Sequence, residues 1–271
     1  MGLRPDQLER YARHILLKEI GGAGQQKLLG AKVLVVGAGG LGAPLLAYLA
    51  AAGVGTIGVV DDDTVSLSNL QRQVLYRTAD VGTPKVAAAK QRLGELNPDC
   101  HIETHHCRVT AENVSTLLAD YDIVADGCDN FATRFLLNDA CYFARKTLVS
   151  GAVGRFDGQL ATFKPYLNKT DGTPYPCYRS LVPDMPPMEA IQDCADTGIV
   201  GALTGIMGSL QALEIIKEIT GAGNGLAGRL LIYDGLAATM RVVSLPWDPA
   251  NPLNGEQPTL TDLSHFSEKI S

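Results

Sequence analysis

Long apolar runs are missing from this sequence of 271 residues. The longest, from about Leu45 to Val54, is rich in Ala and Gly and is shorter than the roughly 20 residues that a membrane-spanning helix needs. The first residues carry charges of both signs and lack the apolar centre of a secretory signal. We therefore expect a cytoplasmic protein with no membrane partner.

Cysteine is also scarce, with six residues scattered without paired spacing. A chain of this length with 46% hydrophobic residues can bury a core without disulfides, so we expect free thiols. The basic residues form no Lys- or Arg-rich stripe, and the net charge is −6. Both features argue against nucleic acid as the main partner.

Short β-branched segments alternate with helix-like segments up to about Ser150. This alternation predicts an α/β fold with a Rossmann-like, doubly wound and mostly parallel sheet. The expected helices are residues 5–29, 41–52 and a segment after Pro84, and the expected strands lie within 31–40, 56–61, 101–107 and 122–127.

The pattern changes beyond Ser150, where residues 158–166, 228–235 and 238–246 are typical of antiparallel strands that extend the same sheet. A segment dense in Pro, Gly and Asp, about 165–196, is expected to cross over the active site. We expect one domain over residues 1–245 and a polar C-terminal tail over 246–271.

A glycine-rich turn follows the first expected strand. Gly37, Gly39 and Gly42 form G-x-G-x-x-G, with Gly40 inside it, where bare backbone and a helix N-terminus can receive phosphates. Asp61 closes the next strand, at a position typical of an acidic ligand for ribose hydroxyls. The pattern predicts a nucleotide site but leaves the nucleotide open, because NAD(P)- and flavin-dependent enzymes share it.

Asn69, Arg72 and Lys85 come soon after that strand. A carboxylate that attacks a triphosphate brings two anions together, and at about 4 Å, in an effective dielectric near 20, two unit charges repel by roughly 4 kcal/mol. Cations and a metal ion offset this repulsion, whereas hydride transfer makes no such demand. These residues favour nucleotidyl transfer, although a solvated loop and a lysine at a helix start would give the same composition.

Asp129 and Asn130 follow the expected strand within 122–127, at the edge where open α/β sheets bind ligands. An aspartate there can hold Mg²⁺ between phosphates, or it can cap the helix that follows. The residues alone leave both interpretations open.

Motifs along most of the chain form a specific combination: RYARHILL at 10–17, VLVVGAGGLG at 33–42, DDDTVSLSNLQRQ at 61–73, VGTPKVAAA at 81–89, DGCDNFATR at 126–134 and CADTGIVGALTGIMGSLQALEIIK at 194–217. Together they resemble the ubiquitin-activating-enzyme superfamily in its bacterial form, the adenylyltransferases of the MoeB, ThiF and HesA types. The resemblance extends to about Leu245.

This resemblance implies ATP-dependent adenylylation of the C-terminal Gly-Gly carboxylate of a ubiquitin-like sulfur-carrier protein. The carrier then receives sulfur in molybdopterin or thiamine biosynthesis, or in a more specialised pathway. The resemblance also implies that Asp61 binds the ribose and that Asp129 holds Mg²⁺. Asn69, Arg72 and Lys85 are implied to contact the phosphates.

The resemblance further implies a homodimer in which Arg13 reaches into the partner subunit's nucleotide site. Cys194 matches the cysteine that in several family members links covalently to sulfur or to the carrier. The start of the following helix favours a thiolate there, but Asp193 and Asp196 oppose ionisation, so a catalytic role and a spectator thiol stay equally open. No rhodanese-like segment follows residue 245, so we expect a separate sulfur donor protein.

One feature of the family is missing. Many relatives hold a structural zinc ion with two C-x-x-C pairs, but the first pair here reads Cys177-Tyr178-Arg179-Ser180. The region of the second pair, residues 244–253, contains no cysteine. Because one thiolate cannot form a tetrahedral site, we predict that the chain binds no structural zinc.

Other functions stay open at this point. An NAD(P)-dependent oxidoreductase would suit the glycine turn but would leave Arg72 and Lys85 unused. A carrier-binding scaffold without catalysis is disfavoured by the complete set of charged residues. An adenylyltransferase acting on a peptide or small-molecule carboxylate fits the sequence as well.

Overall fold

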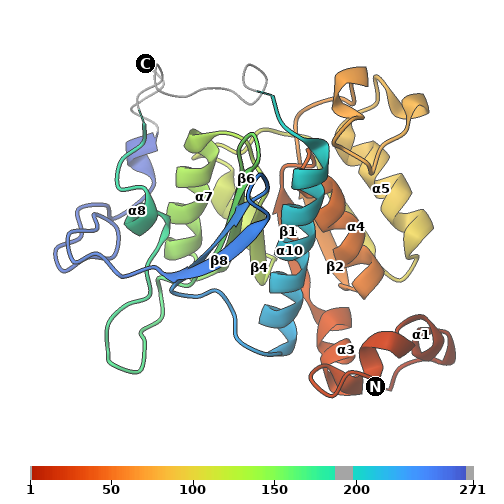
Figure 1. The fold of residues 1–271 in the computed structure, drawn as a ribbon, viewed down its shortest axis with the longest axis horizontal. Coiled ribbons are helices and arrows are strands. Elements are labelled where there is room, and N and C mark those ends of the chain that lie inside the picture. Colours follow the sequence, from red (N-terminus) through yellow and green to blue (C-terminus); the bar gives the residue numbers. More distant parts are fainter. Residues whose placement is uncertain (1, 187–197, 267–271) are drawn as a thin grey trace.

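The structure is a computed structural model that describes residues 2–186 and 198–266. Its centre is an eight-stranded sheet of order β3-β2-β1-β4-β5-β6-β7-β8 (Figure 1). β1 to β5 pair in parallel and β6 to β8 pair antiparallel, which confirms the predicted fold. The strands are β1 (Lys32–Val36), β2 (Thr56–Val60), β3 (His101–His105), β4 (Ile123–Asp126), β5 (Thr147–Val153), β6 (Asp157–Phe163), β7 (Arg229–Asp234) and β8 (Thr239–Ser244).

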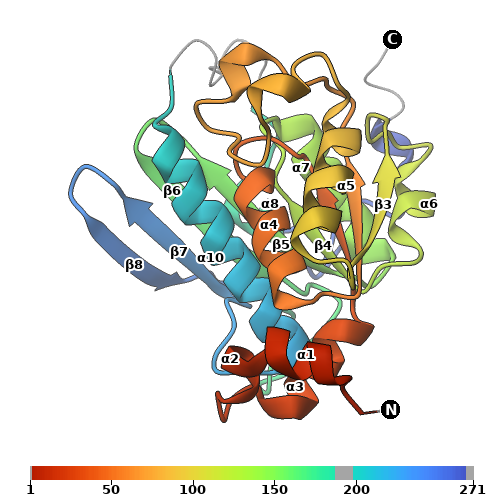
Figure 2. The same ribbon diagram turned by 90° about the vertical axis from the view of Figure 1, so that its right-hand side faces the viewer.

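Helices cover both faces of the parallel part of the sheet (Figures 1 and 2). Short 3-10 turns, η1 (Leu67–Asn69), η2 (Thr78–Asp80) and η4 (Ser264–Phe266), interrupt the loops. The helices are α1 (Pro5–Arg10), α2 (Ala12–Ile15), α3 (Gly21–Gly30), α4 (Gly42–Ala52), α5 (Lys85–Leu96), α6 (Val114–Leu118), α7 (Phe131–Phe143), α8 (Tyr178–Leu181) and α10 (Gly201–Thr220).

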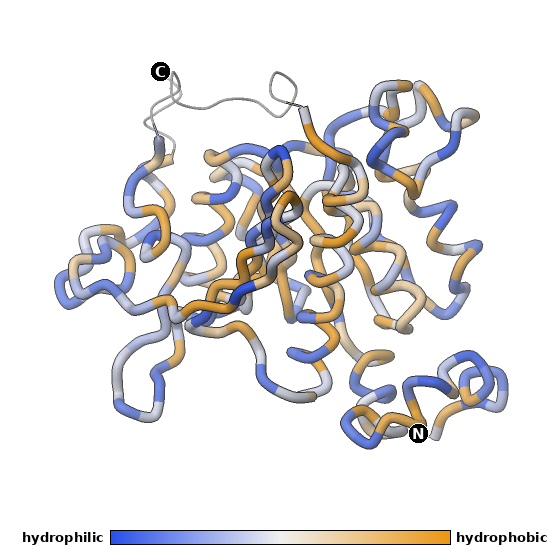
Figure 3. The backbone as a smooth tube through the Cα atoms, viewed as in Figure 1, coloured by the Kyte–Doolittle hydropathy of each residue, from blue (hydrophilic) through white to orange (hydrophobic). Residues whose placement is uncertain are grey.

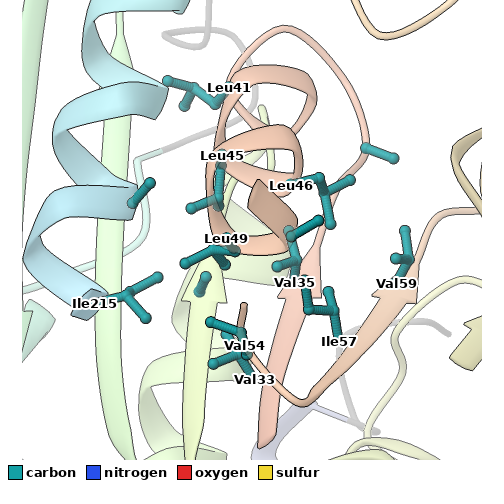
Figure 4. Close-up of a cluster of buried hydrophobic side chains, with 14 of the residues drawn as sticks. Val33, Val35, Leu41, Leu45, Leu46, Leu49, Val54, Ile57, Val59 and Ile215 are labelled. Atoms are coloured by element: carbon teal, nitrogen blue, oxygen red, sulfur yellow. The ribbon is translucent and has the colours of Figure 1, made fainter. Parts of the chain in front are cut away.

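Two hydrophobic clusters sandwich the sheet because successive side chains of a strand point to opposite faces. Val33 and Val35 of β1 pack in the cluster with α4, α5 and α10, whereas Leu34 and Val36 pack in the cluster with α6, α7 and α8. In Figure 4, the leucines of α4 lie over β1 and β2, beside Ile215 of α10. Burying each such side chain contributes about 1.5–3 kcal/mol.

The N-terminal helices lie at the end of the sheet where β1 begins (Figure 2). Residues 5–29 were expected to be helical, and the structure divides them into α1, α2 and α3. Gly21 has a positive φ of 59°, so the chain turns sharply where α3 begins. β1 runs away from these helices, and its carboxyl end therefore lies at the opposite end of the sheet.

The antiparallel hairpin β7–β8 forms one edge of the sheet, and every residue of β8 is exposed. The segment after Leu245, expected to be a polar tail, packs more closely than a surface tail would. Asn251 and Leu253 are each 1% exposed, and the Trp247 indole N–H donates to the carbonyl of Asn254 at 3.0 Å.

Apolar residues follow the strands and central helices, and polar residues colour the outer loops (Figure 3). Within residues 2–186 and 198–266, we find no helix with the length and apolar character required to cross a membrane.

Candidate active site

A cleft of about 550 Å³ opens at the carboxyl ends of the parallel strands. The loops after β1, β2 and β4 form its walls. Open α/β sheets usually bind ligands at this edge, outside the carboxyl ends of their strands. The lining brings together most of the residues predicted for nucleotide binding: Gly37, Gly39, Gly40, Asp61, Asn69, Arg72, Lys85 and Asp129.

The glycine turn lies between β1 and α4 and needs its small residues. Gly37 has a φ of 92°, and a Cβ there would lie 2.7 Å from the Gly127 carbonyl oxygen. A Cβ on Gly42 would lie 2.0 Å from the Gly37 carbonyl oxygen, so the turn requires glycine at this position. Gly42 itself is not among the residues that line the cleft. The backbone N–H groups of Gly39 and Gly40 have no hydrogen-bond partner in the described part of the chain. Free amides at a helix N-terminus are suited to receive phosphate oxygens.

Asp61 follows β2 and is held in place by backbone donors. Its carboxylate accepts hydrogen bonds from the backbone N–H groups of Ala38 at 2.8 Å and Asp63 at 2.9 Å. Burial raises the pKa of Asp61, while Lys85 and the two N–H donors oppose that rise. Each carboxylate oxygen keeps a second lone pair, which leaves room for a hydroxyl donor such as ribose.

Lys85 begins α5 and is only 4% exposed. Its ammonium lies 2.7 Å from a carboxylate oxygen of Asp63 and 3.9 Å from one of Asp61. The carboxylates of Asp61, Asp62 and Asp63 gather within 4.8 Å of one another. The lysine supplies counter-charge to two of them, so this cluster by itself does not indicate a metal site.

Asn69 and Arg72 lie on the loop that follows β2. The Asn69 carboxamide oxygen accepts the backbone N–H of Ser66 at 3.1 Å, which directs its N–H₂ group elsewhere. The Arg72 guanidinium donates to the Ser68 carbonyl at 3.1 Å and lines the cleft. The start of α10 packs against this loop, because a Cβ on Gly201 would lie 3.2 Å from the Arg72 Cα. This packing positions the backbone of the loop that carries Arg72.

The structure separates the roles that the sequence left open for Asp129. Asn130 caps α7, because its side-chain oxygen accepts the Thr133 backbone N–H at 2.9 Å. Asp129 is exposed, lines the cleft and makes no hydrogen bond or ion pair within the described residues. Its carboxylate therefore fits a Mg²⁺ ion that is shared with phosphates and water.

Sequence reasoning missed the ion pair beneath the cleft. Asp126 is fully buried and accepts hydrogen bonds from Arg134 Nε at 3.0 Å, Ser150 Oγ at 2.6 Å and the Cys128 backbone N–H at 3.0 Å. Arg134 also donates to the carbonyls of Cys128 at 2.9 Å and Gly151 at 3.1 Å. The pair thus fixes the turn that carries Asp129. The motif at 126–134 contains both residues, but nothing in its spacing indicated their contact.

Two further predicted residues, Arg13 and Cys194, are not among the described residues that line this cleft. Arg13 is exposed on α2, among the N-terminal helices at the opposite end of the sheet. Cys194 and its neighbours Asp193 and Asp196 lie outside the described residues. Their proposed roles therefore stay predictions.

Hydrogen bonds join the two segments in which many relatives hold their zinc ligands. The Asn251 side-chain N–H₂ donates to Cys177 Sγ at 3.2 Å and to Ser180 Oγ at 3.1 Å. Burial raises the pKa of the Cys177 thiol, so a neutral thiol is favoured there. These contacts tie the segment after Leu245 to α8, and the expectation of a zinc-free chain stays a prediction.

Comparison with curated proteins finds close relatives over almost the whole chain. A sulfur carrier protein adenylyltransferase from Thermus thermophilus is 48% identical, over 96% of this chain and 96% of its own length. The SAMP-activating enzyme E1 of Haloferax volcanii is 47% identical, over 94% of this chain and 92% of its own. The adenylyltransferase and sulfurtransferase MOCS3 of Anopheles gambiae is 49% identical over 98% of this chain. MOCS3 is longer, and the match covers 59% of its length.

Solved structures share the fold at lower identity. Escherichia coli MccB in complex with MccA-N7isoASN has a TM-score of 0.79 and 20% identity, over 91% of this chain and 74% of that one.

Residues 11–253 match the ThiF family. The chain therefore belongs to the ThiF family.

Proposed function

We propose that this protein uses ATP to adenylylate the C-terminal Gly-Gly carboxylate of a ubiquitin-like sulfur-carrier protein. The observation that carries the proposal is the single cleft that gathers a glycine turn, a ribose-type carboxylate, two cations and a free aspartate. The near full-length similarity to a sulfur carrier protein adenylyltransferase supports the same conclusion.

The nucleotide is proposed to bind with its ribose at Asp61 and its phosphates along the free amides of Gly39 and Gly40. Arg72 and Lys85 then bring positive charge to the triphosphate. Lys85 has little solvent around it and pairs with Asp63 at 2.7 Å, so a phosphate oxygen would share its ammonium with that carboxylate. A Mg²⁺ ion at Asp129 would supply further positive charge to the phosphates.

The chemical step is a displacement at the α-phosphorus. A carboxylate oxygen of the carrier attacks it, and the bond to the oxygen that bridges the α- and β-phosphates breaks. Pyrophosphate leaves with the electron pair of that bond, and the carrier ends as a mixed anhydride with AMP. Fixed cations stabilise the negative charge that builds up on the phosphate oxygens, a contribution worth roughly 2.7–4 kcal/mol for each well-placed donor.

We further propose that two copies of the chain form the active unit and that Arg13 reaches the partner subunit's cleft. Arg13 lies at the opposite end of the sheet from its own cleft, so it can serve a nucleotide site only in another subunit. Large apolar side chains are exposed on or beside α2, α4 and α10: Leu16 at 74%, Tyr48 at 57% and Leu213 at 52%. An interface that covered them would remove their apolar surface from water.

Pyrophosphate exchange tests the function. The protein, Mg-ATP and labelled pyrophosphate are incubated with each Gly-Gly carrier that the same source encodes. We expect label in ATP with one carrier, and none with a matched carrier that lacks its terminal glycine. Tight ATP binding without exchange for any carrier would contradict the proposal and favour a peptide or small-molecule carboxylate.

A further inference from the structure

Gln73 is a buried cleft residue to which no role has been assigned. It is 3% exposed and lies directly after Arg72 in the loop that follows β2. Its backbone is already paired, because its N–H donates to the Asn69 carbonyl at 2.9 Å and its carbonyl accepts the Tyr76 N–H at 3.1 Å. Its side chain is therefore the part left to explain.

The side-chain oxygen of Gln73 is buried and has no hydrogen-bond partner among the described residues. No hydrogen bond joins its side-chain nitrogen to another described residue either, so the carboxamide as a whole has no partner in the described part of the chain. A buried polar atom without a partner destabilises a fold by about 1–3 kcal/mol. Methionine or leucine would fill this space without that penalty, so the folded state alone does not account for a glutamine here.

The carboxamide lies over the glycine turn. A Cβ on Gly39 would lie 3.7 Å from Gln73 Nε2, and both residues line the cleft. On the neighbouring side, a Cβ on Gly40 would lie 3.0 Å from the Thr204 side chain, so α10 closes the turn. The free N–H groups of Gly39 and Gly40 and the Gln73 carboxamide therefore border the same space.

We propose that Gln73 binds the nucleotide phosphate that rests on the glycine turn, with its side-chain N–H₂ donating to a phosphate oxygen. A carboxamide carries no net charge, but its N–H₂ group donates a directional hydrogen bond. This bond positions the phosphate between the turn amides and Arg72. The identification of the nucleotide as ATP rests on the proposed function, whereas the phosphate contact itself requires only a nucleotide on the glycine turn.

The test compares Gln73→Met with Gln71→Met, a glutamine in the same loop that is exposed and outside the cleft lining. Affinities for Mg-ATP and for adenosine are measured by calorimetry, and melting temperatures are measured without nucleotide. For Gln73→Met we expect about tenfold weaker ATP binding, equal to one hydrogen bond, with adenosine affinity unchanged. Its melting temperature should equal or exceed that of the wild type, and Gln71→Met should match the wild type throughout.

Gln73→Glu provides a second variant of equal size that places negative charge beside the phosphates. We expect it to weaken ATP binding more than Gln73→Met does and again to spare adenosine. Unchanged ATP affinity in both variants would overturn the inference, and so would equal losses for ATP and adenosine with a lower melting temperature. If the wild type binds another phosphate-bearing nucleotide in place of ATP, the proposed function fails, and the same comparison on that nucleotide still decides the role of Gln73.

Discussion

Replacing Lys85 with methionine is expected to lower the rate of adenylate formation by about 10²–10³-fold, the usual effect of losing one fixed donor to a developing negative charge. Methionine keeps most of the buried aliphatic volume of Lys85 and removes its charge. The loss should appear in the rate of pyrophosphate exchange at saturating carrier, measured beside wild-type protein.

A second consequence of Lys85→Met follows from Asp61. Burial raises the pKa of Asp61 and Lys85 lowers it, so removing the lysine raises this pKa further. The protonated carboxyl group accepts hydrogen bonds less well, so ATP binding by the variant should weaken at a higher pH than in the wild type as the solution is acidified. Lys90 is an exposed lysine on the same helix, and Lys90→Met should leave rate and pH profile unchanged. Wild-type activity of Lys85→Met would contradict the assigned role.

Replacing Asp126 with alanine is expected to destabilise the protein by about 3–5 kcal/mol, because the buried Arg134 guanidinium would lose its counter-charge. That is a large part of the roughly 5–15 kcal/mol by which a typical domain is stable. The Cys128 N–H and the Ser150 hydroxyl would lose their acceptor as well. Urea unfolding followed by circular dichroism measures the change.

Asp120 offers the matched control, since it is an exposed aspartate just before β4. Asp120→Ala should change the free energy of unfolding by no more than about 0.5 kcal/mol. Asp126→Asn keeps the shape of the side chain and should fall between the two. If Asp126→Ala unfolds at the same urea concentration as the wild type, the ion pair is not holding the floor of the cleft.

The fold and most of the residues that line the cleft followed from local signals in the sequence. β1, β2 and β4 are short and almost entirely buried, so each contains a run of apolar residues, and Asp61 stands directly after β2. The glycine turn has a spacing tied to its shape: Gly37 adopts a positive φ, and a Cβ on Gly42 would strike the Gly37 carbonyl. Features set by a single turn or strand end were therefore predictable.

Features that depend on contacts between distant segments were not predictable from the sequence. Asn251 reaches Cys177 across 74 positions of the chain, and no local pattern marks either residue as the partner of the other. Gln73 reads as an ordinary polar loop residue, and only its 3% exposure and unpaired oxygen distinguish it. The burial of Asp126 likewise depends in part on Ser150, which meets it from 24 positions away in the sequence.

Mass spectrometry of the carrier after brief reaction with Mg-ATP tests the central claim most directly. The claim is that the cleft directs the carboxylate to the α-phosphorus, so the C-terminal peptide of the carrier should gain the mass of one AMP group, with pyrophosphate released. A gain of one phosphate group instead would show attack at the γ-phosphorus and would contradict the account, as would an unmodified carrier that nevertheless binds the ATP-loaded protein.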